Sequence, residues 1–145
     1  MFRGRHFHTI DGKGRLSVPA KFRDELNARG ADTLVLTEGG PPCLWAFPLD
    51  QWEKVEQDWN ARTELTPEQR ALMRLVIASA KECPVDGAGR TLVPPDLRQF
   101  AHLTKDVVIV GMLHRFEIWS AERWAEHYGA LRGGFDERGL REFGL

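Results

Sequence analysis

Residues 11–23 read DGKGRLSVPAKFR, and residues 86–98 read DGAGRTLVPPDLR. At an offset of 75 positions, the two stretches share seven of their thirteen residues. The shared pairs are Asp11/Asp86, Gly12/Gly87, Gly14/Gly89, Arg15/Arg90, Val18/Val93, Pro19/Pro94 and Arg23/Arg98. The similarity continues between residues 33–52 (TLVLTEGGPPCLWAFPLDQW) and residues 106–124 (DVVIVGMLHRFEIWSAERW). The chain of 145 residues is therefore predicted to contain two copies of one module of about 45 residues.

Each copy carries the residue pattern of a hairpin, a short helix and a second hairpin. Asp-Gly-x-Gly between alternating polar and apolar residues is typical of a tight turn, because glycine adopts a positive φ angle without a Cβ clash. Pro19 and Pro94 follow the return strand, and proline favours the first turn of a helix. We expect short helices over residues 20–27 and 95–101, and strands over residues 33–37, 43–47, 107–110 and 115–119.

The residues between the two copies show helical spacing. Trp52, Val55 and Trp59 share one helical face, and Thr66-Pro67-Glu68 is a helix-start signal. We expect two helices within residues 50–82, with the tryptophans packed in the core or between helix and sheet rather than stacked on bases. The predicted organisation is a first repeat over 5–52, a helical linker over 53–80, a second repeat over 81–124 and a C-terminal tail over 125–145, of which residues 129–145 are expected to fray.

The composition, at 42% hydrophobic and 28% charged residues, is that of a globular domain and excludes collagen-like, disordered and disulfide-scaffold proteins. No run approaches the roughly 18 apolar residues that a membrane helix requires, and the first residues lack the apolar core of a secretion signal, so we expect a cytoplasmic protein. Cys43 and Cys83 form no Cys-x-x-Cys pair and no ligand set with the five histidines, and we expect buried, reduced thiols.

Positive charge is concentrated at the start of the chain. Residues 1–23 contain six basic residues and one acidic residue, a net charge of +5, whereas the formal net charge of the whole chain is −1, which leaves −6 for residues 24–145. A sign asymmetry of this kind indicates a polyanionic partner, and a basic face that is merely solvated is the alternative.

The Asp-x-x-x-Arg spacing suggests how this charge is presented. Asp11 and Arg15 flank the first turn, so the carboxylate is expected to fix the guanidinium group by a bidentate pair. The remaining donors then suit a phosphate or a guanine edge in the major groove of DNA, whereas the alternative is an ion pair that only holds the turn. We predict DNA contacts by Arg15, Lys13, Arg3, Arg5 and Lys21, with Asp11 orienting Arg15.

The second copy keeps Asp86 and Arg90 but loses its basic neighbours. Lys13, Ser17 and Lys21 of the first copy correspond to Ala88, Leu92 and Asp96. An exposed pair without basic neighbours gains little affinity for DNA, so the structural alternative is favoured for Asp86 and Arg90.

No motif indicates catalysis or a cofactor. His6 and His8 alternate along one strand face, but no third ligand is placed by the sequence, so we predict no metal site. Nucleophile-elbow, nucleotide-loop and His-Glu-x-x-His patterns are missing, and the chain is predicted not to be an enzyme, with a hydrolase as the weakest alternative.

The start MFRG, the doubled Asp-x-x-x-Arg turn with its following Val-Pro, and the segment ECPVDGAGR together resemble the MraZ family of bacterial transcriptional regulators, over essentially the whole chain. The resemblance implies an α+β fold, namely a pseudo-twofold swapped-hairpin β-barrel built from two ββαββ repeats with linking helices, as in AbrB and SpoVT DNA-binding domains. It also implies rings that bind short repeated operator boxes in double-stranded DNA, upstream of the division and cell-wall gene cluster that includes the chain's own gene.

We therefore expect a sequence-specific, nucleoid-associated DNA-binding regulator. The two helices expected within residues 50–82 have an apolar face that includes Trp52, Trp59, Leu72 and Val76 and exceeds what one barrel can cover. We expect this surplus to pack against a neighbouring chain in a closed homo-oligomer. The alternative is an oligomeric interaction module in which the basic residues bind an acidic protein partner, with an antitoxin-like protein as a related variant.

Overall fold

Both sequence repeats fold into the same succession of elements in the computed structural model, which describes residues 1–145. The first repeat contains β1 (Arg5–Thr9), β2 (Arg15–Ser17), α1 (Ala20–Ala28), β3 (Thr33–Glu38), β4 (Leu44–Pro48) and α2 (Leu49–Asn60). The second contains β5 (Lys81–Pro84), β6 (Arg90–Leu92), α4 (Pro95–Phe100), β7 (Asp106–Gly111), β8 (Phe116–Ser120) and α5 (Ala121–Gly133). The predicted helix and strand ranges within the repeats agree with these bounds to within one residue at each end.

Helix α3 (Pro67–Leu72) and the π-helical turn η1 (Met73–Ile77) connect the repeats. The predicted helix start is confirmed, because the Thr66 hydroxyl accepts from the Gln69 N–H at 3.1 Å and the Gln69 side chain accepts from the Thr66 N–H at 2.9 Å. Lys81 and Glu82, predicted to be helical, belong instead to β5, where they pair with Leu36 and Val35 of β3.

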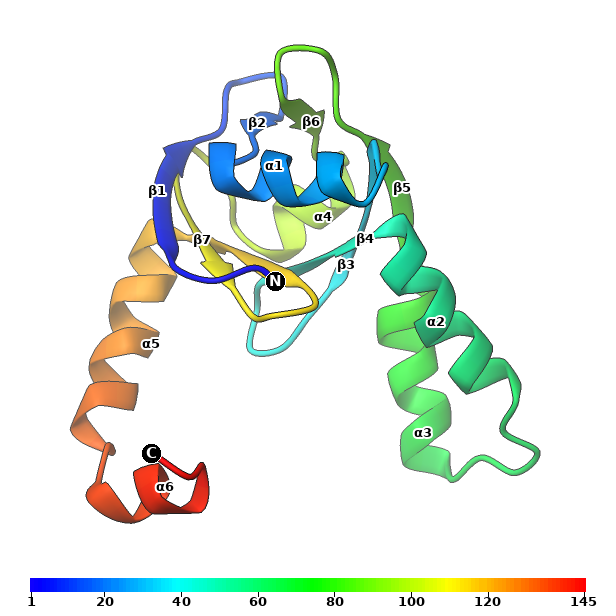
Figure 1. Cartoon of the computed structure of the whole chain (residues 1–145), viewed down its shortest axis with the longest axis vertical. Helices are drawn as coiled ribbons and strands as arrows, with labels where there is room; N and C mark the ends of the chain where they lie inside the picture. Colours follow the sequence, from blue (N-terminus) through cyan, green and yellow to red (C-terminus); the bar gives the residue numbers. More distant parts are fainter.

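The two repeats exchange strands. The larger sheet has the order β1-β7-β8-β4-β3-β5, so β1 of the first repeat pairs with β7 of the second, and β5 of the second pairs with β3 of the first (Figure 1). Strands β2 and β6 pair with each other and form a separate two-stranded ribbon. Each repeat therefore needs the other to complete its sheet.

The predicted α+β class is confirmed, but a closed barrel is not. The six-stranded sheet ends at β1 and β5, and only the single bridges Ile10–Leu16 and Val85–Thr91 connect these edges to the ribbon. Because β2 and β6 are only three residues long, they cannot extend either edge into a continuous ladder.

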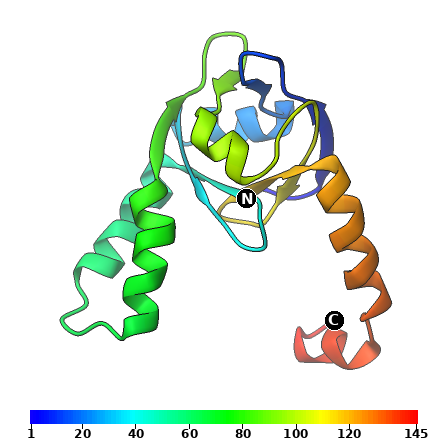
Figure 2. The same cartoon turned by 180° about the vertical axis from the view of Figure 1, so that it is seen from behind.

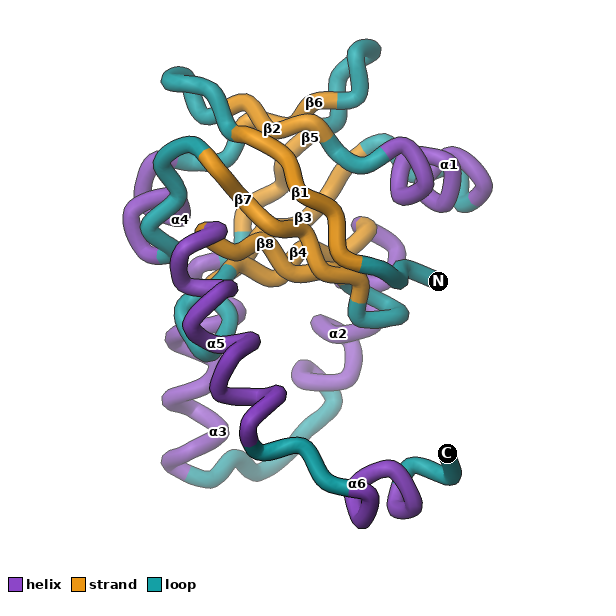
Figure 3. Tube along the Cα trace, turned by 90° about the vertical axis from the view of Figure 1, so that its left-hand side faces the viewer, coloured by secondary structure: helices purple, strands orange, loops and turns teal.

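One apolar core lies between the curved sheet and the two short helices. Figure 3 shows α1 and α4 on opposite sides of the strands, and their buried faces join sheet residues in a cluster of 19 buried side chains. Phe2, Phe22 and Phe116 form its aromatic centre, with ring centroids 5.1–5.3 Å apart. Trp52 is only 3% exposed and packs on Phe47, so the expectation that it belongs to an uncovered face is wrong.

The molecule has two distinct ends. The turns before β2 and β6 project at one end, and the α2–α3 pair and α5 extend from the other as two arms (Figures 1 and 2). Within the predicted tail, α5 continues to Gly133 and α6 (Glu137–Glu142) follows, with the Asp136 side chain accepting from the Gly139 N–H at 3.0 Å. The fraying of this tail stays a prediction. No helix combines the length and apolarity that crossing a bilayer requires.

The core assignment predicts unequal effects for two phenylalanines. Phe22→Ala should lower the free energy of unfolding by about 3–5 kcal/mol, because the side chain is 2% exposed and its removal leaves a cavity. Phe7→Ala is the control, since Phe7 is 73% exposed on β1, and should change it by less than about 0.5 kcal/mol. Denaturant titration at one protein concentration measures both, and equal losses would contradict the assignment.

Candidate nucleic-acid interface

The first turn is built by hydrogen bonds to Asp11. Its Oδ1 atom accepts the backbone N–H groups of Lys13 and Arg15, each at 2.9 Å, and its carbonyl oxygen accepts the N–H of Gly14 at 2.9 Å. Gly14 closes the turn with a φ angle of 88°, a value that favours glycine. The carboxylate therefore shapes the backbone as well as the side-chain pair.

The second carboxylate oxygen of Asp11 holds Arg15. The Arg15 Nε atom donates to Asp11 Oδ2 at 2.6 Å, which confirms the predicted pairing, but the prediction of a bidentate pair is wrong because Oδ1 is already used by the turn. The Nη groups of Arg15 thus have no hydrogen-bond partner within the protein. Hydrogen bonds from the backbone and side chain of Arg15 lower the pKa of Asp11 to about 2, so the pair stays ionised at neutral pH.

The second turn repeats this backbone but holds its arginine more loosely. Asp86 Oδ1 accepts the N–H groups of Ala88 and Arg90, each at 2.9 Å. The Arg90 Nε atom lies 3.6 Å from Asp86 Oδ2, beyond hydrogen-bond distance. The pKa of Asp86 is lowered mainly by the hydrogen bond from the Arg90 backbone, and the positive charge of Arg15 lowers it further. The two motifs are therefore close enough to interact electrostatically.

The ribbon brings both arginines to one surface. In the β2–β6 register, Arg15 pairs with Leu92 and Ser17 pairs with Arg90, and directly paired side chains share a face of the ribbon. Between them, Leu16 and Thr91 point to the opposite face and are each 1% exposed. Arg15 and Arg90 are thus diagonal neighbours on the outer face, a spacing within reach of long side chains.

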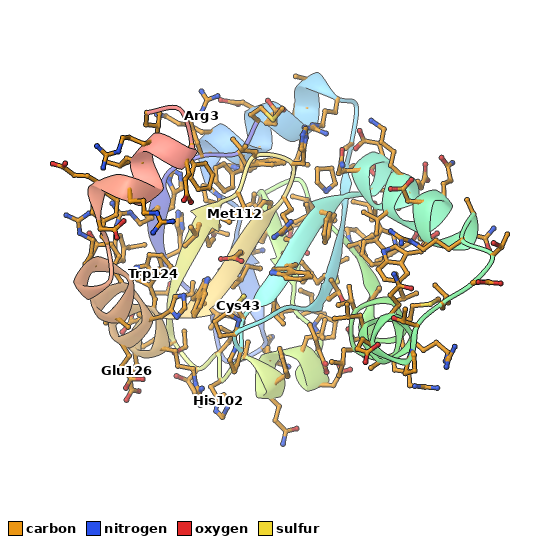
Figure 4. All side chains as sticks on the ribbon, turned by 90° about the horizontal axis from the view of Figure 1, so that it is seen from below. Arg3, Cys43, His102, Met112, Trp124 and Glu126 are labelled. Carbon is orange, nitrogen blue, oxygen red and sulfur yellow. The ribbon has the colours of Figure 1, made fainter.

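The predicted basic residues do not all lie together. Lys13 is exposed in the first turn, and Lys21 is exposed on the first turn of α1, which follows β2. Arg5 lies at the far end of β1, with its guanidinium carbon 4.9 Å from the ring centroid of Tyr128 on α5. Figure 4 views the molecule from the end opposite the turns and shows Arg3 on that side. The structure therefore separates Arg3 and Arg5 from the Arg15 surface.

In the second repeat, an ion pair also offsets the positive charge of a lysine. Asp96, which replaces Lys21, accepts a hydrogen bond from Lys81 Nζ at 2.6 Å. This contact lowers the pKa of Asp96 and compensates the charge of Lys81. Leu92 replaces Ser17 on the outer face and is 57% exposed. The second repeat thus has no lysine at the positions equivalent to Lys13 and Lys21 of the first repeat.

His6 and His8 of β1, and the two cysteines, lie outside the β2–β6 ribbon and its turns. His6 and His8 share one face of β1 as predicted, and the His6 ring packs on Phe22 at a centroid distance of 4.9 Å. Burial, His6 and Arg23 together lower the pKa of His8. No group of three His, Cys, Asp or Glu side chains is arranged to hold a metal ion. Cys43 and Cys83 are free and buried as expected, and burial raises the pKa of Cys83 to about 11.

Sequence reasoning missed three residues beside the turns. Arg23 and Arg98 lie against the turn glycines, and Leu92 is exposed between the two motif arginines. The identity of Arg23 and Arg98 in the two repeats was the available signal for the first two.

Two glycines of the first turn provide a test of its geometry. Gly14→Ala should lower the free energy of unfolding, because a left-handed φ costs about 1–2 kcal/mol for a residue with a Cβ atom. It should also displace Arg15, because Arg98 occupies the space that the Cβ atom needs. Gly12→Ala is the matched control, since nothing lies within 4 Å of its Cβ position. Thermal unfolding measures both variants, and a Gly14→Ala protein as stable as Gly12→Ala would refute this description of the turn.

The sequence matches one known protein family twice, once in each half of the chain that contains a turn. The sequence matches the family described as "MraZ protein, putative antitoxin-like" over residues 1–75 and 76–135. It is 47% identical over 126 residues to the transcriptional regulator MraZ of Syntrophobacter fumaroxidans (strain DSM 10017 / MPOB), covering 87% of this chain and 83% of that protein. It is 46% identical over 127 residues to the protein of that name from Desulfitobacterium hafniense (strain Y51), covering 88% and 86%. For the Pseudomonas fluorescens (strain Pf0-1) protein of that name, identity is 43% over 125 residues, covering 86% and 83%. With two family matches that together span residues 1–135, the chain belongs to the MraZ family.

Proposed function

We propose that the chain is a transcription regulator that binds double-stranded DNA through the β2–β6 ribbon and its two turns. The observation that carries the proposal is Arg15, which Asp11 holds by Nε at 2.6 Å while its Nη donors are free at one end of the molecule. Arginine presented in this way suits guanine or phosphate. The naming of the relatives as transcriptional regulators supports the same function.

The two repeats have unequal roles in this proposal. Arg15, Lys13 and Lys21 of the first repeat make the main contacts, with Asp11 orienting Arg15. Arg90 contributes less, because its ion pair with Asp86 is longer and its turn lacks lysine neighbours. Arg3 and Arg5 are not proposed as partners of Arg15, since they lie at the opposite end of β1. The exchange of β1 and β5 between repeats supports classification with the swapped-hairpin folds.

Assembly into a closed ring is proposed from the two arms. The α2–α3 arm, with the following turn η1, exposes Leu72 and Leu75. The same arm carries Glu53 and Glu56, which line a pocket with Trp59. The α5 arm exposes Leu131 and Phe135 beside Arg5 and Arg132. Surfaces that are complementary in charge and lie on opposite sides of one chain favour head-to-tail contacts, which close into rings. Such a ring presents several turns to tandem operator boxes, which we place upstream of the division and cell-wall gene cluster and its own gene, in the nucleoid.

Salt dependence of binding tests the proposed interface. If Arg3, Arg5, Lys13 and Lys21 each neutralised one phosphate, the slope of log affinity against log salt would be about −3.6 per engaged chain. The contacts proposed above, by Lys13, Arg15 and Lys21, neutralise three phosphates and give a slope of about −2.7 instead.

The measurement is a gel-shift titration of the chain's own upstream DNA at several salt concentrations, with a coding fragment of equal length as the control. A shift of the upstream fragment at lower protein concentration supports specific binding. Equal affinity for both fragments, or no shift of either, would refute the proposal and leave an acidic protein as the partner.

A further inference from the structure

Arg23 and Arg98 form the last identical pair of the stretches 11–23 and 86–98 and take part in neither motif ion pair. Arg23 belongs to α1 of the first repeat and Arg98 to α4 of the second. The Nε atom of each is shielded from water and has no hydrogen-bond partner. Because an unpartnered buried N–H group is unfavourable, other contacts hold these side chains in place.

Arg98 lies against the turn of the other repeat. A Cβ atom built on Gly14 would lie 2.7 Å from Cζ and 2.8 Å from Nε of Arg98. Gly14 is itself buried and has a positive φ angle. The guanidinium group therefore rests on the backbone of the first turn, at a separation that only glycine permits.

The reciprocal contact joins Arg23 to the second turn. A Cβ atom built on Gly89 would lie 2.8 Å from Cζ of Arg23. The backbone shows the same exchange, because the Val18 N–H donates to the Gly89 carbonyl at 2.9 Å and the Val93 N–H donates to the Gly14 carbonyl at 2.8 Å. Each turn glycine is thus held by the other repeat through one backbone hydrogen bond and one arginine.

We propose that Arg23 and Arg98 are positioning residues that act across the repeats, Arg98 on the turn that carries Arg15 and Arg23 on the turn that carries Arg90. Gly14 directly precedes Arg15, so a displaced Gly14 moves the backbone N–H that Asp11 accepts and the guanidinium group that Asp11 orients. The second repeat then controls the DNA surface of the first, although its own motif is less basic. The effect on DNA binding rests on the proposed function, whereas the effect on the turns does not.

Hydrogen exchange of the full chain without DNA, followed by mass spectrometry, tests whether each arginine supports the turn of the other repeat. Arg98→Ala should speed exchange in residues 10–16 about two- to tenfold, because the turn loses the guanidinium group that packs on Gly14, and should leave residues 85–91 unchanged. Arg23→Ala should give the opposite pattern. If either alanine variant fails to fold, the corresponding lysine variant, which keeps charge and length but lacks the planar guanidinium group, should show the same pattern with smaller amplitude.

Three results would overturn the proposal. Faster exchange in both turns with either variant would show a general loss of stability. Faster exchange only in the turn of the substituted repeat would show a local role. Unchanged exchange in both turns would show that the arginines support neither.

DNA binding provides the second readout. Arg98→Ala should weaken binding to the upstream DNA about 5- to 100-fold, and combining it with Arg15→Lys, which keeps a measurable affinity, should cause less than the sum of the two single losses. Direct contact of Arg98 with phosphate would instead make the losses additive and reduce the salt slope by about 0.9, which overturns a positioning role. A wild-type chain that binds no DNA would refute the proposed function, while the crossed exchange pattern would still establish the contacts across the repeats.

Discussion

Arg15→Ala is expected to abolish specific binding to the upstream DNA while leaving the fold intact. The Arg15 side chain is 40% exposed, and its only intramolecular side-chain partner is Asp11, so its removal opens no cavity in the core. The loss of a guanine or phosphate contact costs about 1–3 kcal/mol per subunit, and several subunits engaged on tandem boxes multiply the loss. Gel-shift titration at fixed salt measures the affinity, and circular dichroism with light scattering checks fold and assembly.

Arg90→Ala is the matched control for Arg15→Ala. Both arginines follow an Asp-Gly-x-Gly turn on the same face of the ribbon, but the Arg90 ion pair is 3.6 Å long against 2.6 Å for Arg15. We expect a smaller loss of affinity for Arg90→Ala. Equal losses would show that both repeats bind DNA to the same extent, and wild-type affinity in a folded Arg15→Ala protein would contradict the proposed interface.

A single operator box should bind the protein about 10²–10⁴-fold more weakly than tandem boxes with matching spacing, because linked contacts convert later binding events into intramolecular ones. This gain requires assembly. Leu75→Glu should reduce it, because Leu75 is 55% exposed on the proposed contact arm and a carboxylate there would be buried next to apolar surface. Light scattering measures assembly, and titration of one-box and multi-box DNA measures the gain.

Leu113→Glu provides the control for the assembly experiment. Leu113 is also 55% exposed but lies in the connection between β7 and β8, outside both proposed contact surfaces. It should leave assembly and the preference for tandem boxes unchanged. A wild-type chain that is monomeric at micromolar concentration, or that binds one box as tightly as several, would refute the avidity mechanism.

The repeated sequence was sufficient to predict most local structure. Gly12, Gly14 and Pro19 end or redirect the chain through their own backbone preferences, and these preferences recur at the equivalent positions of the second repeat. The Asp11–Arg15 pair was predictable for the same reason, because the two residues flank one short turn. The sequence did not predict that Asp11 Oδ1 accepts the backbone N–H groups while Oδ2 accepts Arg15 Nε, since this depends on the hydrogen-bond directions of the folded turn.

Which basic residues lie near Arg15 could be decided only from the folded strand β1. Arg3 and Arg5 were grouped with Arg15 because they are close in sequence, but an extended strand carries Arg5 about 3.3 Å per residue away from the turn. Its partner is therefore Tyr128, far along the chain. Trp52 shows the same dependence, since its helical face was readable from spacing but its burial against Phe47 depends on how α2 meets the sheet.

The sequence by itself determined the two modules, their turns and the oriented Arg15, because these follow from backbone preferences and contacts within a few residues. Only the tertiary structure decided that β1 pairs with β7, that the sheet remains open, and that Arg98 supports the turn of the other repeat. Those features depend on contacts such as Arg5 with Val110, whose residues are distant in the chain. Many pairings satisfy the same alternation of polar and apolar residues, and the choice among them is made when the whole apolar core is buried at once.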